Sequence, residues 1–197
     1  MTHETRGPWR VHSTQVEYEN PWLRVESSKI THPDGTPGIY GVVYIANLAT
    51  GVLPIDAEGY TWLVGQHRYP ANTYSWELPE GGGQKGVDPW VSASRELKEE
   101  TGLIAASHCC VGEWELSNSV TDEVAFGYLA WDLTEGPSSP EPSEDLTVVR
   151  LPFADLLARM RAGKIRDAFT HLIVNGAIDQ ARQGRLPAPI SDILLSA

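Results

Sequence analysis

The sequence predicts an α+β fold or a mixed α/β/α sandwich, and three observations lead to this expectation. Strand-like segments are followed by a helical segment, then by further strands, and finally by helices. The 197 residues suffice for one domain with a buried core and an additional subdomain. A content of 41% hydrophobic and 21% charged residues is typical of a globular protein.

The first third of the chain is expected to be antiparallel β structure. Residues 1–10 are polar and are expected to be mobile. Turn-forming residues occupy 32–38, between strand-like segments at 23–31 and 39–46, and this order predicts a hairpin. Residues 51–58 indicate a loop with a short strand, and 60–66 a further strand.

The remainder alternates helices and strands around a glycine-rich loop at 81–83. Asp88 and Gly102 suit the two caps of a helix over 89–101, and Pro89 suits its first turn. The other expected elements are strands at 108–116 and 124–133 around a loop at 117–123, a surface loop at 134–144, and helices at 153–161 and 167–182.

Charge and cysteine content restrict the classes of function. Fifteen Lys and Arg against 26 Asp and Glu give a net charge of −11, which disfavours nucleic-acid or anionic membrane partners. A phosphate-bearing substrate would therefore need a cation between itself and the protein. Cys109 and Cys110 lack zinc-ligand spacing, and no signal segment or membrane-spanning apolar run is present, so a cytoplasmic protein is expected.

Three carboxylates share one face of the helix predicted over 89–101. Glu96, Glu99 and Glu100 lie three and four residues apart, near the helix C-terminus, where negative charge is unfavourable. Such a cluster calls for a neutralising partner, and oxygen ligands favour Mg²⁺ or Mn²⁺. The alternative is a solvated acidic face, and the glycines at 81–83 could alternatively form a plain turn.

The glycine loop and this helix together resemble the Nudix box, G-x5-E-x7-R-E-U-x-E-E-x-G-U, in which U is aliphatic. Val87 departs from the pattern by replacing the first Glu, so Arg95 would need another partner, such as Asp88. The positions that agree, over 23 residues, are Gly81, Arg95, Glu96, Leu97, Glu99, Glu100, Gly102 and Leu103.

Further segments are similar to the ADP-ribose and nucleoside-diphosphate-sugar pyrophosphatase branch of that family. They lie at 66–70, 74–81, 117–123 and 163–167, so the resemblance covers most of residues 15–180. It implies a Nudix α/β/α sandwich over 48–197, preceded over 1–47 by an antiparallel β region. That region is expected to help build a homodimer, in which it is often exchanged between subunits, and to bind the base.

The resemblance also implies metal ligands and catalytic groups. Glu96, Glu99 and Glu100 would be metal ligands together with the backbone carbonyl of Glu80, and Arg95 joins Glu99 and Glu100 among the catalytic residues. Glu123 matches a loop carboxylate that binds metal or takes a proton from water. Asp122 is the alternative, and an acidic pair capping a turn is the structural explanation.

Substrate contacts are expected in both parts of the chain, residues 1–47 and residues 48–197. Arg68 matches an arginine that grips phosphate or ribose, although an ion pair with Glu77 would also explain it. Glu77 could itself touch metal or ribose. Trp22 and Tyr40 match aromatics that clamp the base, with core or interface packing as the alternative, and Arg24 could assist them.

The expected activity is Mg²⁺-dependent hydrolysis of ADP-ribose to AMP and ribose 5-phosphate. A GDP-mannose or UDP-sugar pyrophosphatase is the alternative within the class. A non-catalytic nucleotide-sugar sensor is the alternative of another class, and Val87 alone supports it. RNA-end processing is disfavoured by the net charge of −11.

Overall fold

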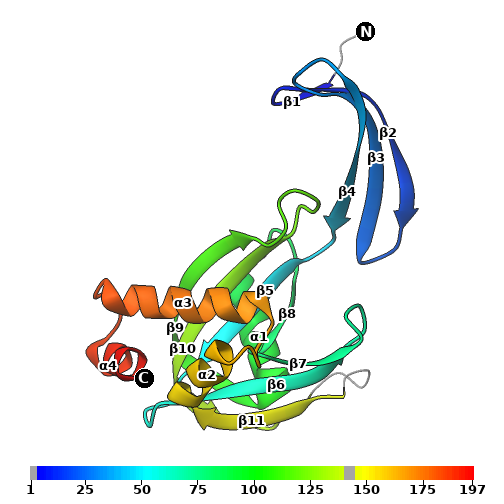
Figure 1. The fold of residues 1–197 in the computed structure, drawn as a ribbon. Coiled ribbons are helices and arrows are strands. Elements are labelled where there is room, and N and C mark those ends of the chain that lie inside the picture. The colour runs from blue at the N-terminus through cyan, green and yellow to red at the C-terminus, as the bar shows by residue number, and fades with distance from the viewer. Residues whose placement is uncertain (1–3, 140–144) are drawn as a thin grey trace. The chain divides into compact units, whose positions relative to one another are not determined.

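The computed structural model describes residues 4–139 and 145–197, which fall into two compact units (Figure 1). The first unit comprises the chain up to Leu48 together with Glu115–Val124. The second comprises Ala49–Trp114 and Ala125–Ala197. In the described part of the chain, no helix has both the length and the apolar character needed to span a membrane.

The first unit is built on one four-stranded antiparallel sheet, drawn in blue in Figure 1. Its strands, in spatial order, are β1 (Glu4–Arg6), β2 (Trp9–Glu19), β3 (Leu23–Thr31) and β4 (Pro37–Ile45). The predicted hairpin is confirmed as β3 and β4, whose turn is fixed by Asp34, since its carboxylate accepts the N–H of Thr36 at 2.9 Å. Gly35 supplies the positive φ of 89° within this turn.

The expectation of mobility over residues 1–10 is wrong for the described residues 4–10, which form β1 and the start of β2. Register pairs join Arg10 to Thr31 of β3, and the Trp9 ring packs edge-on against Tyr40 at 5.5 Å. Backbone pairing and aromatic packing thus order a stretch whose polar side chains gave no strand signal. Residues 1–3 lie outside the described part.

A second segment, far along the chain, belongs to the first unit. The loop over 117–123 bonds to β4: the amide of Val43 donates to the carbonyl of Val120 at 2.8 Å. The Tyr40 hydroxyl donates to the carbonyl of Ser119 at 2.9 Å, and the amide of Ile45 to the carboxylate of Asp122 at 2.7 Å. These contacts confirm a loop over 117–123 and show what holds it.

The described residues of the second unit form two sheets and four helices. One sheet has the order β8-β5-β10-β9, with β5 and β10 parallel, and the other has the antiparallel order β11-β6-β7. The strands are β5 (Leu48–Pro54), β6 (Tyr60–Arg68), β7 (Thr73–Glu77), β8 (Glu80–Gly83), β9 (Leu103–Glu115), β10 (Val124–Glu135) and β11 (Thr147–Pro152). The helices are α1 (Pro89–Thr101), α2 (Phe153–Arg161), α3 (Ala168–Arg182) and α4 (Ala188–Ser196).

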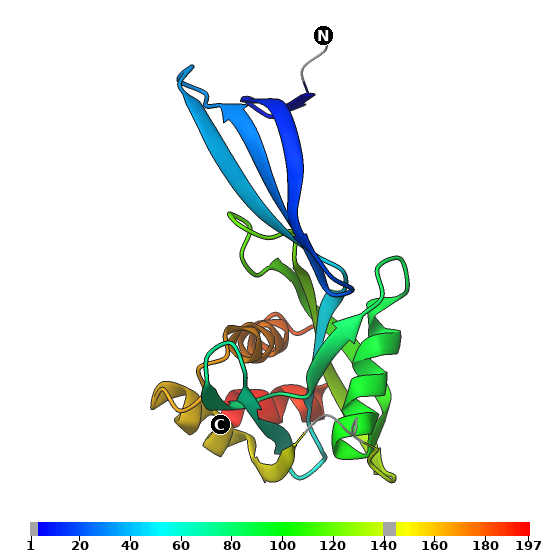
Figure 2. The ribbon, with the colours of Figure 1, turned by 90° about the vertical axis from the view of Figure 1, so that its right-hand side faces the viewer.

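Helices cover both faces of the four-stranded sheet, which confirms the α/β/α sandwich. Successive residues of β5 point to opposite faces. A side chain at Gly51 would meet Ile173 of α3 at 2.7 Å, whereas Val52 lies in the core cluster with Leu97 of α1. Figure 2 shows α1 and α3 on opposite sides of this sheet.

Helix α1 has the predicted bounds and caps. The Asp88 carboxylate accepts the amide of Trp90 at 3.0 Å, and Gly102 ends the helix with a left-handed φ of 75°. Other elements were not predicted, or not at their full extent, among them β5 as a complete strand, β7, β8 within the glycine loop, β11 and α4. In the predicted loop over 134–144, β10 extends to Glu135, and residues 140–144 lie outside the described part.

Candidate functional site

The three box carboxylates lie on α1 with Arg95 among them. The Arg95 guanidinium pairs with Glu96 at 2.7 Å and with Glu99 at 2.6 Å, and it also donates to the carbonyl of Gly82 at 3.2 Å. Asp88, suggested as a partner for Arg95, caps the helix instead. Arg95 thus pairs with two glutamates, and neither contact needs the acidic residue that Val87 replaces.

The side chain of Glu96 occupies the space next to Gly81 that the β-carbon of any other residue would fill. A β-carbon at position 81 would come within 2.3 Å of Cδ and 2.4 Å of Oε1 of Glu96. The carboxyl group therefore rests directly on the backbone of β8. Glu100, on the same helix, is only 5% exposed. Three carboxylates on one face of α1, of which Glu96 rests on Gly81, fit a hard divalent cation such as Mg²⁺ or Mn²⁺.

A second group of carboxylates surrounds Arg68 in the same unit. Arg68 bonds to Glu77 at 2.5 Å and to Glu80 at 2.9 Å. Glu77, Glu80 and Asp167 bring oxygen atoms within 4.8 Å of one another. Burial, together with the charges of Asp167, Glu77 and, more weakly, Glu100, raises the pKa of Glu80 well above its usual range, although Arg68 opposes this.

The ion pair offered as an alternative role for Arg68 is present. Burial acts to lower the pKa of Arg68, but the hydrogen bond and charge of Glu77 outweigh it and the pKa rises. The side chain nevertheless stays 40% exposed. It borders a hollow of about 230 Å³ that Lys164 and Arg166 also line. Both cations lie within the segment 163–167 that is similar to the family, but the sequence analysis assigned neither of them a role in the site.

Tyr40 and Trp22 lie in different parts of the N-terminal sheet. Tyr40 pairs in register with Ser28, whereas the carbonyl of Trp22 accepts the amide of Ala46. Six residues of strand, or about 20 Å, therefore separate them within one chain. Trp22 is 69% exposed.

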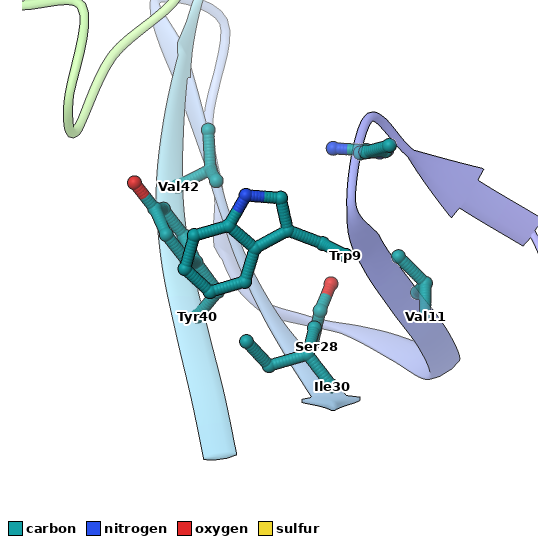
Figure 3. Close-up of a pocket in the computed structure, with 7 residues that line it drawn as sticks. Trp9, Val11, Ser28, Ile30, Tyr40 and Val42 are labelled. Carbon is teal, nitrogen blue, oxygen red and sulfur yellow. The ribbon is translucent and has the colours of Figure 1, made fainter. Parts of the chain in front are cut away.

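The aromatic neighbour of Tyr40 is instead Trp9, which the sequence analysis did not single out. Figure 3 shows Trp9 and Tyr40 in one hollow of about 210 Å³, with Ser28 and Ile30 beside them. Arg24 lies elsewhere on the sheet, bonded to Glu26 at 2.9 Å and 5.1 Å from the centre of the Tyr44 ring. Only the long-range pairing of β2 with β3 could have revealed Trp9.

The loop carboxylates have different surroundings. Asp122 accepts the amide of Ile45, so its side chain takes part in anchoring the loop to β4. Glu123 is partly buried, and its amide donates to the Thr121 hydroxyl at 3.4 Å. The structural role of Asp122 leaves Glu123 as the better candidate for chemistry.

Comparison with known protein families gives two matches. A model described as NUDIX domain matches residues 46–172, which is more than half of the chain. A model described as Nucleoside diphosphate sugar hydrolase N-terminal domain matches residues 9–43.

Individual relatives agree with these matches. An ADP-ribose pyrophosphatase of Bacillus subtilis is 32% identical over 62% of this chain and 67% of its own. An ADP-sugar pyrophosphatase of Mus musculus is 28% identical over 90% and 87%, respectively. The crystal structure of an ADP compounds hydrolase covers 89% of this chain and 96% of its own, with a TM-score of 0.78 at 20% identity, which shows the shared fold.

Proposed function

Because the chain belongs to the Nudix hydrolase family, we propose that it hydrolyses the diphosphate bond of ADP-ribose or a related nucleoside diphosphate sugar in the presence of Mg²⁺. The products would be a nucleoside monophosphate and a sugar phosphate. The names of the bacterial and mouse relatives support ADP-linked sugars. GDP-mannose and UDP-sugars remain the alternative substrates, since no residue described above reads the base.

The observation that carries this proposal is the seating of Glu96 on Gly81 beside the other α1 carboxylates. We propose that Glu96, Glu99, Glu100, Glu123 and the backbone carbonyl of Glu80 hold Mg²⁺, with Mn²⁺ as a substitute. The bound ion would neutralise the diphosphate and activate the attacking water. Arg95 orients Glu96 and Glu99 for this task through its two ion pairs.

Glu123 is proposed to take the proton from the attacking water. A carboxylate suits this role when its oxygen atoms are available to the water. The hydrogen bond from Ile45 engages Asp122, which favours Glu123 over its neighbour. We expect Asp122→Ala to disturb the loop, because it removes the acceptor of the Ile45 amide, and Glu123→Gln to remove the base.

Arg68 and Glu77 are proposed to contact the phosphate and ribose. The fork of an arginine binds two phosphate oxygens at once, and the 40% exposure of Arg68 leaves part of the guanidinium accessible. Its existing pairs with Glu77 and Glu80 fix its orientation before substrate arrives.

The base is proposed to stack on the N-terminal region, residues 1–47, in a homodimer. Trp22 and Tyr40 are about 20 Å apart within one chain by strand register, so sandwiching one base between them requires residues from two chains. Arg24 would assist on the same sheet. Dimerisation would also cover a sheet that has no second layer among the described residues of its own unit.

A substrate screen tests the proposed function. The full-length protein is incubated with ADP-ribose, ADP-sugars, GDP-mannose and UDP-sugars plus Mg²⁺, and phosphate is measured after phosphatase treatment, with Glu99→Gln as the control. We expect release from ADP-linked sugars by the wild type only. Binding of nucleotide sugars without release from any of them would favour the sensor and overturn the proposal.

A further inference from the structure

Residues 78–81, which join β7 to β8 and begin β8, are held at three points by hydrogen bonds from elsewhere in the second unit. The amide of Leu78 donates to Oγ1 of Thr170 at 2.9 Å, and the carbonyl of Pro79 accepts the amide of Val52 at 2.9 Å. Oγ1 of Thr50 donates to the carbonyl of Gly81 at 3.2 Å. Two of the three bonds thus come from threonine hydroxyls.

Both threonine residues are completely buried. Thr50 lies on β5, and Thr170 lies in the first turn of α3, where the Asp167 carboxylate accepts its amide at 2.5 Å. Away from solvent, no water competes for the two hydroxyls, so their hydrogen bonds hold the segment in one geometry. The helix cap thus fixes the backbone of Thr170, whose hydroxyl accepts the amide of Leu78.

Residues 80 and 81 of this segment carry two parts of the proposed site. Glu80 bonds to Arg68, and Gly81 receives the carboxyl of Glu96. A displacement of the segment would move both features relative to α1. We propose that Thr50 and Thr170 are positioning residues, whose hydroxyls set the segment in the geometry that the metal site requires. This inference rests on the proposed function.

Thr61 of β6 provides a matched control. It is also completely buried, yet its hydroxyl finds no hydrogen-bond partner in the described part of the chain. Valine has nearly the shape of threonine and lacks only the hydroxyl. Thr61→Val should therefore leave the site untouched and the stability equal or higher, because it removes a buried polar atom without a partner.

The test uses full-length Thr50→Val, Thr170→Val and Thr61→Val, with Thr50→Ser and Thr170→Ser as conservative variants. Mn²⁺ affinity is measured from the electron paramagnetic resonance signal of free Mn²⁺, alongside Tm, and kcat and KM for ADP-ribose with Mg²⁺. Loss of either positioning hydroxyl should weaken Mn²⁺ binding and lower kcat by about tenfold or more, while KM changes little. Serine should restore both values, and Thr61→Val should match the wild type.

A purely structural role predicts a different pattern. Thr50→Val and Thr170→Val would then lower Tm but keep wild-type Mn²⁺ affinity and kcat at temperatures well below Tm, and this result would overturn the inference. If one of the two variants does not fold, the other decides. If the wild type binds Mn²⁺ but hydrolyses no nucleotide sugar, the proposed function fails, and the Mn²⁺ measurements still decide the role of the threonines.

Discussion

Replacing Gly81 with alanine should separate the activity of this protein from its stability. The added β-carbon would lie 2.3 Å from Cδ of Glu96, whereas ordinary contact begins at 3.4 Å, so the carboxyl group must retreat by about 1 Å. Gly81 is not among the glycines with positive φ, and alanine can adopt its backbone conformation. The end of a glutamate side chain moves at small cost.

The expected effects follow from these distances. A displacement of about 1 Å at a group that must be positioned within about 0.5 Å costs roughly a hundredfold in rate. The folded state loses little stability. Replacing glycine by alanine also lowers the conformational entropy of the unfolded chain, and this favours folding by about 0.4–1 kcal/mol and offsets the loss of stability. We therefore expect kcat to fall by about a hundredfold and Tm to stay within a few degrees.

Steady-state kinetics with ADP-ribose and Mg²⁺, together with calorimetric Tm, measure both effects. Gly136→Ala is the matched control, since among residues 4–139 and 145–197 its β-carbon would meet Gly102 O at 3.5 Å and Ile104 Cδ1 at 3.6 Å, both at ordinary contact distance. A wild-type kcat and Mg²⁺ dependence in Gly81→Ala would refute the reasoning, because Glu96 would then not need its place on β8.

Three further substitutions test other parts of the molecule. Glu99→Gln should lower kcat by about a hundredfold or more at unchanged Tm, because it removes one charge from the carboxylate cluster, and near-native kcat would contradict this. Trp22→Ala should raise KM by about tenfold to a hundredfold at constant kcat, since stacking is similar in ground and transition states; an unchanged KM in a dimer verified by sedimentation would assign Trp22 to packing. Gly102→Ala should lower the free energy of unfolding by at least about 1–3 kcal/mol, because its φ is 75° and the β-carbon would lie 2.3 Å from the carbonyl of Gly136. Denaturant titration measures this loss, and an unchanged midpoint would show that the cap is dispensable.

Local signals account for the elements that the sequence predicted well. Helix α1 is indicated by Asp88, Pro89 and Gly102, each of which acts within one helical turn. Strand β5 gives no comparable signal, because Gly51 and Pro54 are poor strand formers. It becomes a strand because β10 pairs with it and α3 fills the space that Gly51 leaves open, and both contacts come from distant parts of the chain.

The same distinction applies to the candidate site. Periodicity alone places Glu96, Glu99 and Glu100 on one face of α1. Asp88 was suggested as the partner of Arg95, but it caps the helix, and the partner Glu99 lies at the i,i+4 spacing that a local pattern does indicate. The contribution of Thr170 depends on a hydrogen bond that spans 92 residues, and no local pattern reveals such a contact.

The grouping of Glu115–Val124 with the N-terminal sheet has a consequence for how such proteins could be recombined. From the sequence, the N-terminal region would be taken for a separate module that can be exchanged, since it ends before residue 48. Its β4 strand, however, supplies the hydrogen bonds that shape the loop bearing Glu123. A chimera that exchanges residues 1–47 for those of a relative would therefore need the relative's 115–124 loop as well, so these two stretches should be inherited, and engineered, as one unit.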